Sequence, residues 1–414
     1  MLARLLGPYG RGVFSIAFVP SQLLVSLAGS ASDGTLYFLS RERQARPQIL
    51  NVMLVYIAVA SGVVLGLLGL LFALTNGSLL RGVPLPVYAI AAGSVPFALW
   101  LSLAESYLFA LHRVRASQVG VLMERLVTTG GLVVIWIAGA GLYPIVTLTT
   151  ISLALASLVA AWLIGFREVL SAARAPVERT RLVELLRYSR SIALANIAQK
   201  LTYRLDQLII NVIAGPATVG IYAISARLAE VTLVVPRAFR LTWAADRARR
   251  NDISASAPET LNGGRKLAAL MLIALPLYGA IAVPLIPLIY GDAFSGSVVP
   301  FVFLLGGSFA ISQSLAYVAA LTGAGKPKAL ALVSWIGAAT TIALDLVLVP
   351  SAGATGAAIA SLIAYAVFSL GIIIAWHKLV GRGVRYVEHV PRRSDVEAVS
   401  RVLLSRLRAA GHRA

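Results

Sequence analysis

The chain has 414 residues, of which 58% are hydrophobic and 13% are charged, and its mean hydropathy is +0.84. Soluble domains carry about 25% charged residues, so this composition excludes a soluble globular protein and predicts an all-α integral membrane protein. The net charge of +19 does not indicate nucleic-acid binding, because the basic residues mark loops between apolar runs rather than one soluble face. The chain has no cysteine, which excludes disulfides and thiolate metal sites.

Eleven apolar runs, each close to the roughly 20 residues that cross a bilayer, predict eleven membrane-spanning helices. In chain order they are expected at 12–39, 49–74, 86–111, 119–141, 145–165, 188–213, 217–236, 267–290, 298–322, 329–349 and 354–376. Of the 36 Lys and Arg residues, 29 lie in alternate loops and in the C-terminal tail. By the positive-inside rule, we expect these loops and the C-terminal tail to lie in the cytoplasm.

Two sequence matches point to an internal duplication. The segment GPYGRGVFSI at 7–16 aligns with GPATVGIYAI at 215–224, and YLFAL at 107–111 aligns with YVAAL at 317–321. The two alignments differ by nearly the same shift, 208 and 210 residues, and each pair of segments lies at the same place relative to a span. Both observations favour two parallel repeats. Coincidence is the alternative, because Gly, Ala and Leu are abundant throughout the chain.

The repeat predicts the domain organisation. We expect an N-terminal helical lobe at 1–165, a charged cytoplasmic connector at 166–187, a C-terminal lobe at 188–376 and a basic cytoplasmic tail at 377–414. A full span precedes Gly215, whereas six residues precede Gly7. We therefore expect a twelve-helix design whose first helix is mostly missing here, with the functional protein beginning about 20 to 25 residues upstream of Met1. The alternative is a genuine eleven-span protein.

Span 188–213 has one polar face and one apolar face at helical periodicity. The polar positions are Asn196, Lys200, Tyr203, Arg204, Gln207 and Asn211. Lys200 and Arg204 lie one turn apart and repel each other unless an anion or Asp206 is close, and Arg suits bidentate phosphate contact. These residues are therefore candidate cavity-lining and substrate-binding residues, and the alternative is a structural charge cluster that holds the lobes together.

Four further charged residues are candidates. Arg11 opens the first span near its outer end and is a candidate substrate-binding residue, although snorkelling to the interface also explains it. Asp206 lies at the edge of the polar face. Arg227 and Glu230 stand three residues apart, so they can pair along one helix. Asp206, Arg227 and Glu230 are candidate coupling or gating residues, and a satisfied ion pair without a transport role is the alternative for the last two.

The acidic and basic residues Glu105, Glu124 and Arg125 are expected within about two turns of the cytoplasmic ends of their spans. Charges near span ends usually snorkel or cap a helix. We therefore expect these three residues to stay away from substrate.

The chain resembles the polysaccharide-transporter, or oligosaccharide flippase, family (Wzx-type) of the MOP superfamily. The resemblance rests on the order and spacing of several stretches. They are RLLGPYGRGVFSI near the start, YRLDQLIINVIAGPATVGIYAISARLAEV at 203–231, LIPLIYGDAF at 285–294, and the region from LTGAGKP to VLVPSAGATGAAIASLIAY at 321–365.

The resemblance implies a MATE/MOP-like bundle of two six-helix lobes around a cavity that opens alternately to either side. It also implies the substrate, an undecaprenyl-pyrophosphate-linked oligosaccharide moved from the inner to the outer leaflet of the bacterial cytoplasmic membrane. The expected partners are this lipid-linked oligosaccharide, the membrane, and the glycosyltransferases and polymerase of the same pathway. Nucleic acid is not an expected partner.

No enzyme motif stands out. GAGKPK at 323–328 lacks the spacing and the Ser/Thr of a phosphate-binding loop, and Gly-x-Ser-x-Gly is missing. We expect no cofactor and no metal, while coupling to an ion gradient stays open. One alternative is a MATE-type multidrug exporter, although such exporters use buried acids and span 188–213 is net basic. Another is a glycan polymerase or ligase, although Asp292 is the one acid in the expected outer loops.

Overall fold

The computed structural model is helical throughout the part of the chain that it describes. It describes residues 2–32, 35, 38–39, 46–75, 77–240, 243, 257–324, 326–381 and 386–401, and at 2, 188–203, 327, 386 and 387 the backbone alone. The chain forms two compact units, Met1–Gly220 and Ile221–Ala414. Each unit is described below by itself.

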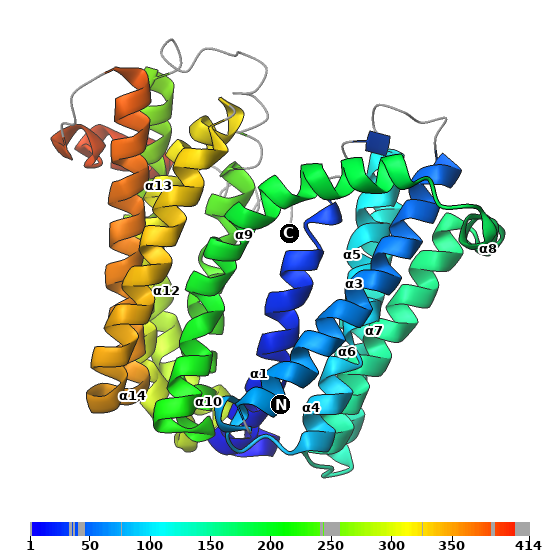
Figure 1. Cartoon of the computed structure of the whole chain (residues 1–414). Coiled ribbons are helices and arrows are strands. Elements are labelled where there is room, and N and C mark those ends of the chain that lie inside the picture. Colours follow the sequence, from blue (N-terminus) through cyan, green and yellow to red (C-terminus); the bar gives the residue numbers. More distant parts are fainter. Residues whose placement is uncertain are drawn as a thin grey trace, which may run out of the picture. The chain divides into compact units, whose positions relative to one another are not determined.

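The first unit is a bundle of long apolar helices (Figure 1). They are α1 Leu2–Ala28, α3 Arg46–Leu74, α4 Leu85–Ala92, α5 Val95–Ala110, α6 Val114–Ile137, α7 Leu142–Ile164, α8 Phe166–Arg174 and α9 Arg179–Ala214, with the short helix η2 at Ser78–Leu80. Helix α6 packs on α7, α5 packs on both, and α1 packs on α9. The run expected as one span at 86–111 is divided into α4 and α5 at Gly93, because Pro96 follows and lacks the N–H that would continue the helical ladder.

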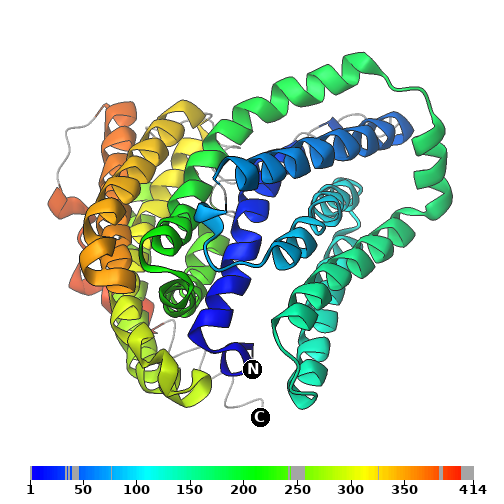
Figure 2. The same ribbon diagram turned by 60° about the horizontal axis from the view of Figure 1, so that its bottom comes forward.

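The connector expected at 166–187 is helical. Gly165 has φ 119° and ends α7, so the chain turns there into α8. After a short gap, α9 begins at Arg179. The first part of α9 runs across the ends of neighbouring helices of its own unit before the helix turns along α1 (Figures 1 and 2). The lobe boundaries expected from the repeat stay a prediction.

The second unit holds α10 Pro216–Val231, whose first residues belong to the first unit, and then α12 Ala257–Tyr290, η3 Asp292–Ser297, α13 Val298–Gly323, α14 Pro327–Val380 and η4 Tyr386–His389. Helix α14 is a hairpin, because Gly353 has φ 52° and ψ −128° and breaks it in the middle. Its two arms lie side by side. A Cβ on Gly371 would stand 2.7 Å from Val333 Cγ1, and one on Gly337 would stand 3.6 Å from Phe368 Cβ.

Among the described residues, eight helices are long and apolar enough to cross a membrane, or nine if the pair Pro216–Val231 and Val234–Arg240, bent by 50°, is one span. Eleven spans were predicted, two more than the nine that include the bent pair, for two reasons. The hairpin α14 is counted once although it contains the predicted spans 329–349 and 354–376. Helix α9 does not qualify because charged residues interrupt its apolar sequence.

The described part of the tail packs on its own unit. Gln313 Nε2 on α13 donates a hydrogen bond to the carbonyl oxygen of His389 at 2.7 Å. Arg265 on α12 pairs with Asp395 at 3.4 Å, and both side chains are largely buried. Residues 386–401 are therefore held against α12 and α13, an arrangement that the sequence did not indicate.

Candidate transport site

The two copies of the repeated motif have the same backbone conformation. Gly7 has φ 62° and ψ −178°, and Gly215 has φ 82° and ψ 175°. Only glycine adopts this region readily, and in both copies a proline follows and begins a new helical segment. The matching geometry agrees with the duplication inferred from the sequence.

The two motifs also contact each other, through residues that all belong to the first unit. A Cβ added to Gly12 would clash with the carbonyl oxygen of Pro216, and a Cβ added to Gly220 would clash with that of Pro8. The contact is reciprocal, as in an interface with a two-fold axis, because Pro8 corresponds to Pro216 and Gly12 to Gly220. Arg11 precedes this contact directly, and its guanidinium carbon lies 5.4 Å from the centre of the Phe14 ring.

A short loop closes over the same contact. The hydroxyl of Tyr9 donates to the carbonyl oxygen of Gly82 at 3.3 Å. Asn211 is fully buried, and its amide nitrogen donates to the carbonyl oxygens of Leu79 and Arg81 at 3.1 and 3.2 Å. Asn211, which the sequence placed on the cavity-lining face of α9, is thus a structural residue that ties α9 to the loop after η2.

The rest of the predicted polar face of α9 is described only in part. The side chains of Asn196, Lys200 and Tyr203 lie outside the described residues. Arg204 is partly exposed. Beyond Arg204, the face is packed inside the first unit.

Two of these packed residues are predicted site residues. Gln207 is 3% exposed and Asp206 is 1% exposed. The carboxylate of Asp206 accepts a hydrogen bond from the backbone N–H of Gln207 at 2.7 Å. The substrate-binding and coupling roles assigned to these two residues stay predictions.

Arg227 and Glu230 form the ion pair that their spacing predicts. The guanidinium nitrogen and carboxylate oxygen are 3.4 Å apart, with the side chains 57% and 24% exposed. Its proposed role in coupling or gating stays a prediction, because an exposed pair within one helix also forms without any transport role.

Glu124 and Arg125 lie where the sequence analysis did not expect them. Helix α6 begins at Val114 instead of 119, so Glu124 is ten residues, or about 15 Å, from its start and near its middle. The expectation that this pair lies near a span end was wrong, because the helix begins directly after the tight turn at His112, before the apolar run itself starts.

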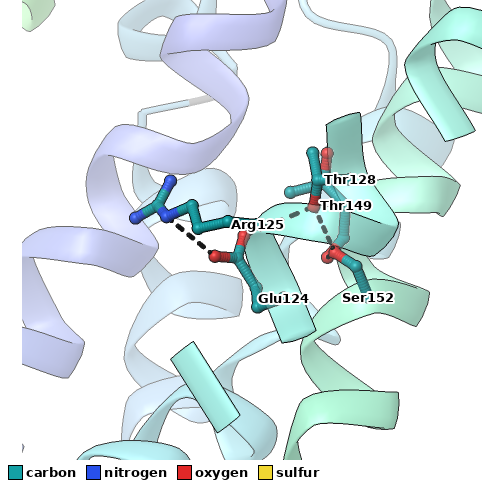
Figure 3. Close-up of polar contacts among 5 residues, drawn as sticks. All are labelled: Glu124, Arg125, Thr128, Thr149 and Ser152. Atoms are coloured by element: carbon teal, nitrogen blue, oxygen red, sulfur yellow. Dashed lines mark hydrogen bonds and ion pairs between the residues drawn. The ribbon is translucent and has the colours of Figure 1, made fainter. Parts of the chain in front are cut away.

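These two residues belong to a polar network between α6 and α7 (Figure 3). Glu124 pairs with Arg125 at 3.0 Å, and their side chains are 12% and 75% exposed. The hydroxyl of Thr128 bonds to Glu124 at 3.4 Å and to Ser152 at 2.8 Å, and the hydroxyl of Ser152 donates to the carbonyl oxygen of Thr149 at 2.9 Å. A largely buried acid therefore anchors an arginine that extends away from the helix.

The fold is shared with solved membrane transporters. It is similar to an inward-facing multidrug resistance MATE family transporter of the MOP superfamily, with a TM-score of 0.76 and 14% identity over 92% of both chains. It is also similar to the lipid II flippase MurJ in an inward closed conformation, with a TM-score of 0.66 and 13% identity over 91% of this chain and 88% of that one. A MOP superfamily transporter from Pyrococcus furiosus matches with a TM-score of 0.63 and 13% identity over 92% and 90% of the two chains.

The chain belongs to the family described as "Polysaccharide biosynthesis protein", whose model matches residues 1–236. No curated protein matches the chain. The family resemblance and the MATE/MOP-like fold class inferred from the sequence are therefore confirmed.

Proposed function

We propose that this protein is a flippase for undecaprenyl-pyrophosphate-linked oligosaccharides. It moves them from the inner to the outer leaflet of the bacterial cytoplasmic membrane by alternating access through a cationic cavity, with its C-terminus in the cytoplasm. The family description and the similarity to a lipid II flippase support a lipid-linked substrate. The protein acts without a cofactor, and its partners are the glycosyltransferases and polymerase of the same pathway.

The observation that carries this proposal is the position of Arg125. Its side chain is 75% exposed although it lies near the middle of a 24-residue apolar helix. A guanidinium at that depth is costly to place in lipid, which supports a position that faces a water-filled cavity. Arg11 and Arg204, on the packed helices α1 and α9, are partly exposed and add positive charge to the same unit.

A cationic cavity suits a pyrophosphate. Arginine presents two parallel N–H donors that match the oxygens of a phosphate group, and such charge-assisted hydrogen bonds are strong. The neutral sugar units then require only space and hydrogen bonds. A cavity with this charge repels organic cations, the substrates that buried acids would attract.

Multidrug export is the second candidate, because the MATE transporter is matched with a higher TM-score than MurJ. The purified protein in liposomes separates the two functions. Its rate of leaflet exchange is measured with a fluorescent polyprenyl-pyrophosphate glycan, with the matching monophosphate, and with a cationic dye. Faster exchange of the pyrophosphate supports the flippase, whereas transport of the dye alone contradicts it.

A further inference from the structure

A groove in the second unit has properties that the transport cycle does not explain. It has a volume of about 800 Å³ and runs between the two arms of α14. Three lysines, Lys326, Lys328 and Lys378, stand at its mouth, and all three are exposed. Among the described residues no carboxylate lines the groove, and α14 has no acidic residue in its first turn. Among the described residues that line the groove, the three lysines are the only charged side chains.

The walls of the groove are apolar and open outward. Leu332 is 64% exposed and Ile336 is 47% exposed on one arm, and Ile374 lies on the other. Gly371 forms the floor, because its missing side chain lets the two arms approach each other at Val333. From Lys328 to Ile336 the first arm rises about 12 Å, so a molecule with a charged head at the lysines would place about that length of chain on apolar side chains.

We propose that this groove binds one anionic glycerophospholipid, with its phosphate between the three lysines and an acyl chain along the walls. The lysines attract a negative headgroup, as basic residues at a membrane surface do. Exposed leucine and isoleucine side chains are more stable against hydrocarbon than against water, so the walls suit an acyl chain. A second copy of this chain does not fit, because it would bring six lysines together. None of the residues that line the groove belongs to the residues proposed for the cationic cavity.

Native mass spectrometry of the full chain, released from detergent, tests the proposal. Phosphatidylglycerol and phosphatidylcholine with the same acyl chains are titrated, together with glycerol 3-phosphate as a headgroup without acyl chains. We expect phosphatidylglycerol to bind at least about tenfold more tightly than phosphatidylcholine, and glycerol 3-phosphate not to bind, because both halves of the groove contribute.

Two variants locate the site. The triple variant Lys326→Gln, Lys328→Gln, Lys378→Gln is expected to lose phosphatidylglycerol affinity by about fivefold per lysine. Ala329→Phe, which fills the groove without changing charge, is expected to weaken both lipids. The matched control Arg115→Gln, Arg167→Gln, Arg187→Gln removes three exposed charges from the first unit and is expected to bind phosphatidylglycerol normally.

The proposal has clear points of failure. Equal binding of both phospholipids, or an equal loss of affinity in the lysine variant and the control, overturns it, as does tight binding of glycerol 3-phosphate alone. Substituting arginine for the three lysines keeps the charge and is expected to restore binding, which separates lipid recognition from a folding defect. Binding is measured without transport, so its result does not depend on the proposed flippase activity.

Discussion

Gly12 and Gly220 occupy equivalent positions in the two repeats and pack directly on each other. A Cβ built on either glycine would lie 3.1 Å from the backbone nitrogen of the other, and each would also clash with a proline carbonyl oxygen from the opposite motif. No side-chain rotation can relieve such a clash, because the atoms in the way belong to the backbone. The absence of side chains at these two positions is therefore what allows the contact.

Gly12→Ala and Gly220→Ala are each expected to destabilise the protein by about 1–3 kcal/mol, the usual cost of an added methyl group in a packed contact. The midpoint of thermal unfolding in detergent measures the effect. Gly62→Ala and Gly66→Ala in α3 are matched controls, because their added Cβ atoms would meet no atom within 4 Å. Unchanged stability of both contact variants would show that the motifs are not packed in this way.

Arg125→Ala is expected to reduce glycan flipping at least about tenfold. Because the change also leaves the largely buried Glu124 without its ion-pair partner, the flipping rate is compared at equal amounts of folded protein. Arg125→Lys keeps the charge but loses the paired N–H donors, so it should restore part of the rate. Arg115→Ala, at the exposed start of the same helix, is the control. If Arg125→Ala flips glycan at the normal rate, the cationic cavity loses its main support.

Lys200→Ala and Arg204→Ala are each expected to abolish surface delivery of the lipid-linked glycan while the protein level stays normal. Both belong to the polar face predicted for α9, and both would contribute to phosphate binding. Immunoblotting and surface labelling of the glycan measure the two quantities. Arg187→Ala, an exposed position of the same helix, is the matched control. Normal delivery by the double variant would remove these residues from the mechanism.

The docked tail is expected to respond to pH. The His377 and His389 ring nitrogens Nε2 are 2.8 Å apart, so one must donate and the other accept, and His389 Nδ1 contacts the hydroxyl of Tyr317. Burial, and secondarily the nearby His377, lowers the pKa of His389 to about 4, while Glu388 opposes this and Arg265 adds to it.

The direction in which docking changes with pH follows from this lowered pKa of His389. The undocked histidine, with an ordinary pKa near 6.5, binds protons more readily than the docked one. The contribution of His389 to the free energy of docking is therefore fully present above about pH 6.5. It decreases as the pH falls toward 4, by at most about 3 kcal/mol. The anisotropy of a fluorophore at Ser394→Cys, the only cysteine in that variant, reports it.

His389→Gln should flatten the pH dependence of the anisotropy. The exposed His112→Gln should leave it unchanged. If the label stays immobile down to pH 4 in the parent protein, the histidine pair does not control docking.

The sequence predicts best the features that depend on local apolar pattern. The span expected at 298–322 is observed as α13 at Val298–Gly323, and that expected at 145–165 as α7 at Leu142–Ile164. The motif repeat was visible for a similar reason, since Gly7 and Gly215 each need a conformation that few other residues adopt.

The remaining features depend on residues far apart in the chain. Asn211 looks like a cavity residue by periodicity, yet it bonds to carbonyl groups about 130 positions earlier. His389 lies in a basic tail whose sequence does not show what the tail packs against, and it is buried there by contacts with α13 and α14. The depth of Glu124 depended on where α6 begins, and helix boundaries are the least certain part of any such prediction.

The hairpin of α14 has a consequence for biosynthesis. Its arms, residues 327–352 and 354–380, meet at Gly353 with no charged residue in the turn, and both lysines of the hairpin, Lys328 and Lys378, lie at its open end, next to Lys326. Neither arm has a polar segment on the far side that could hold it in place alone. We therefore expect both arms to enter the bilayer together as a pre-paired unit, with the lysines at its trailing end.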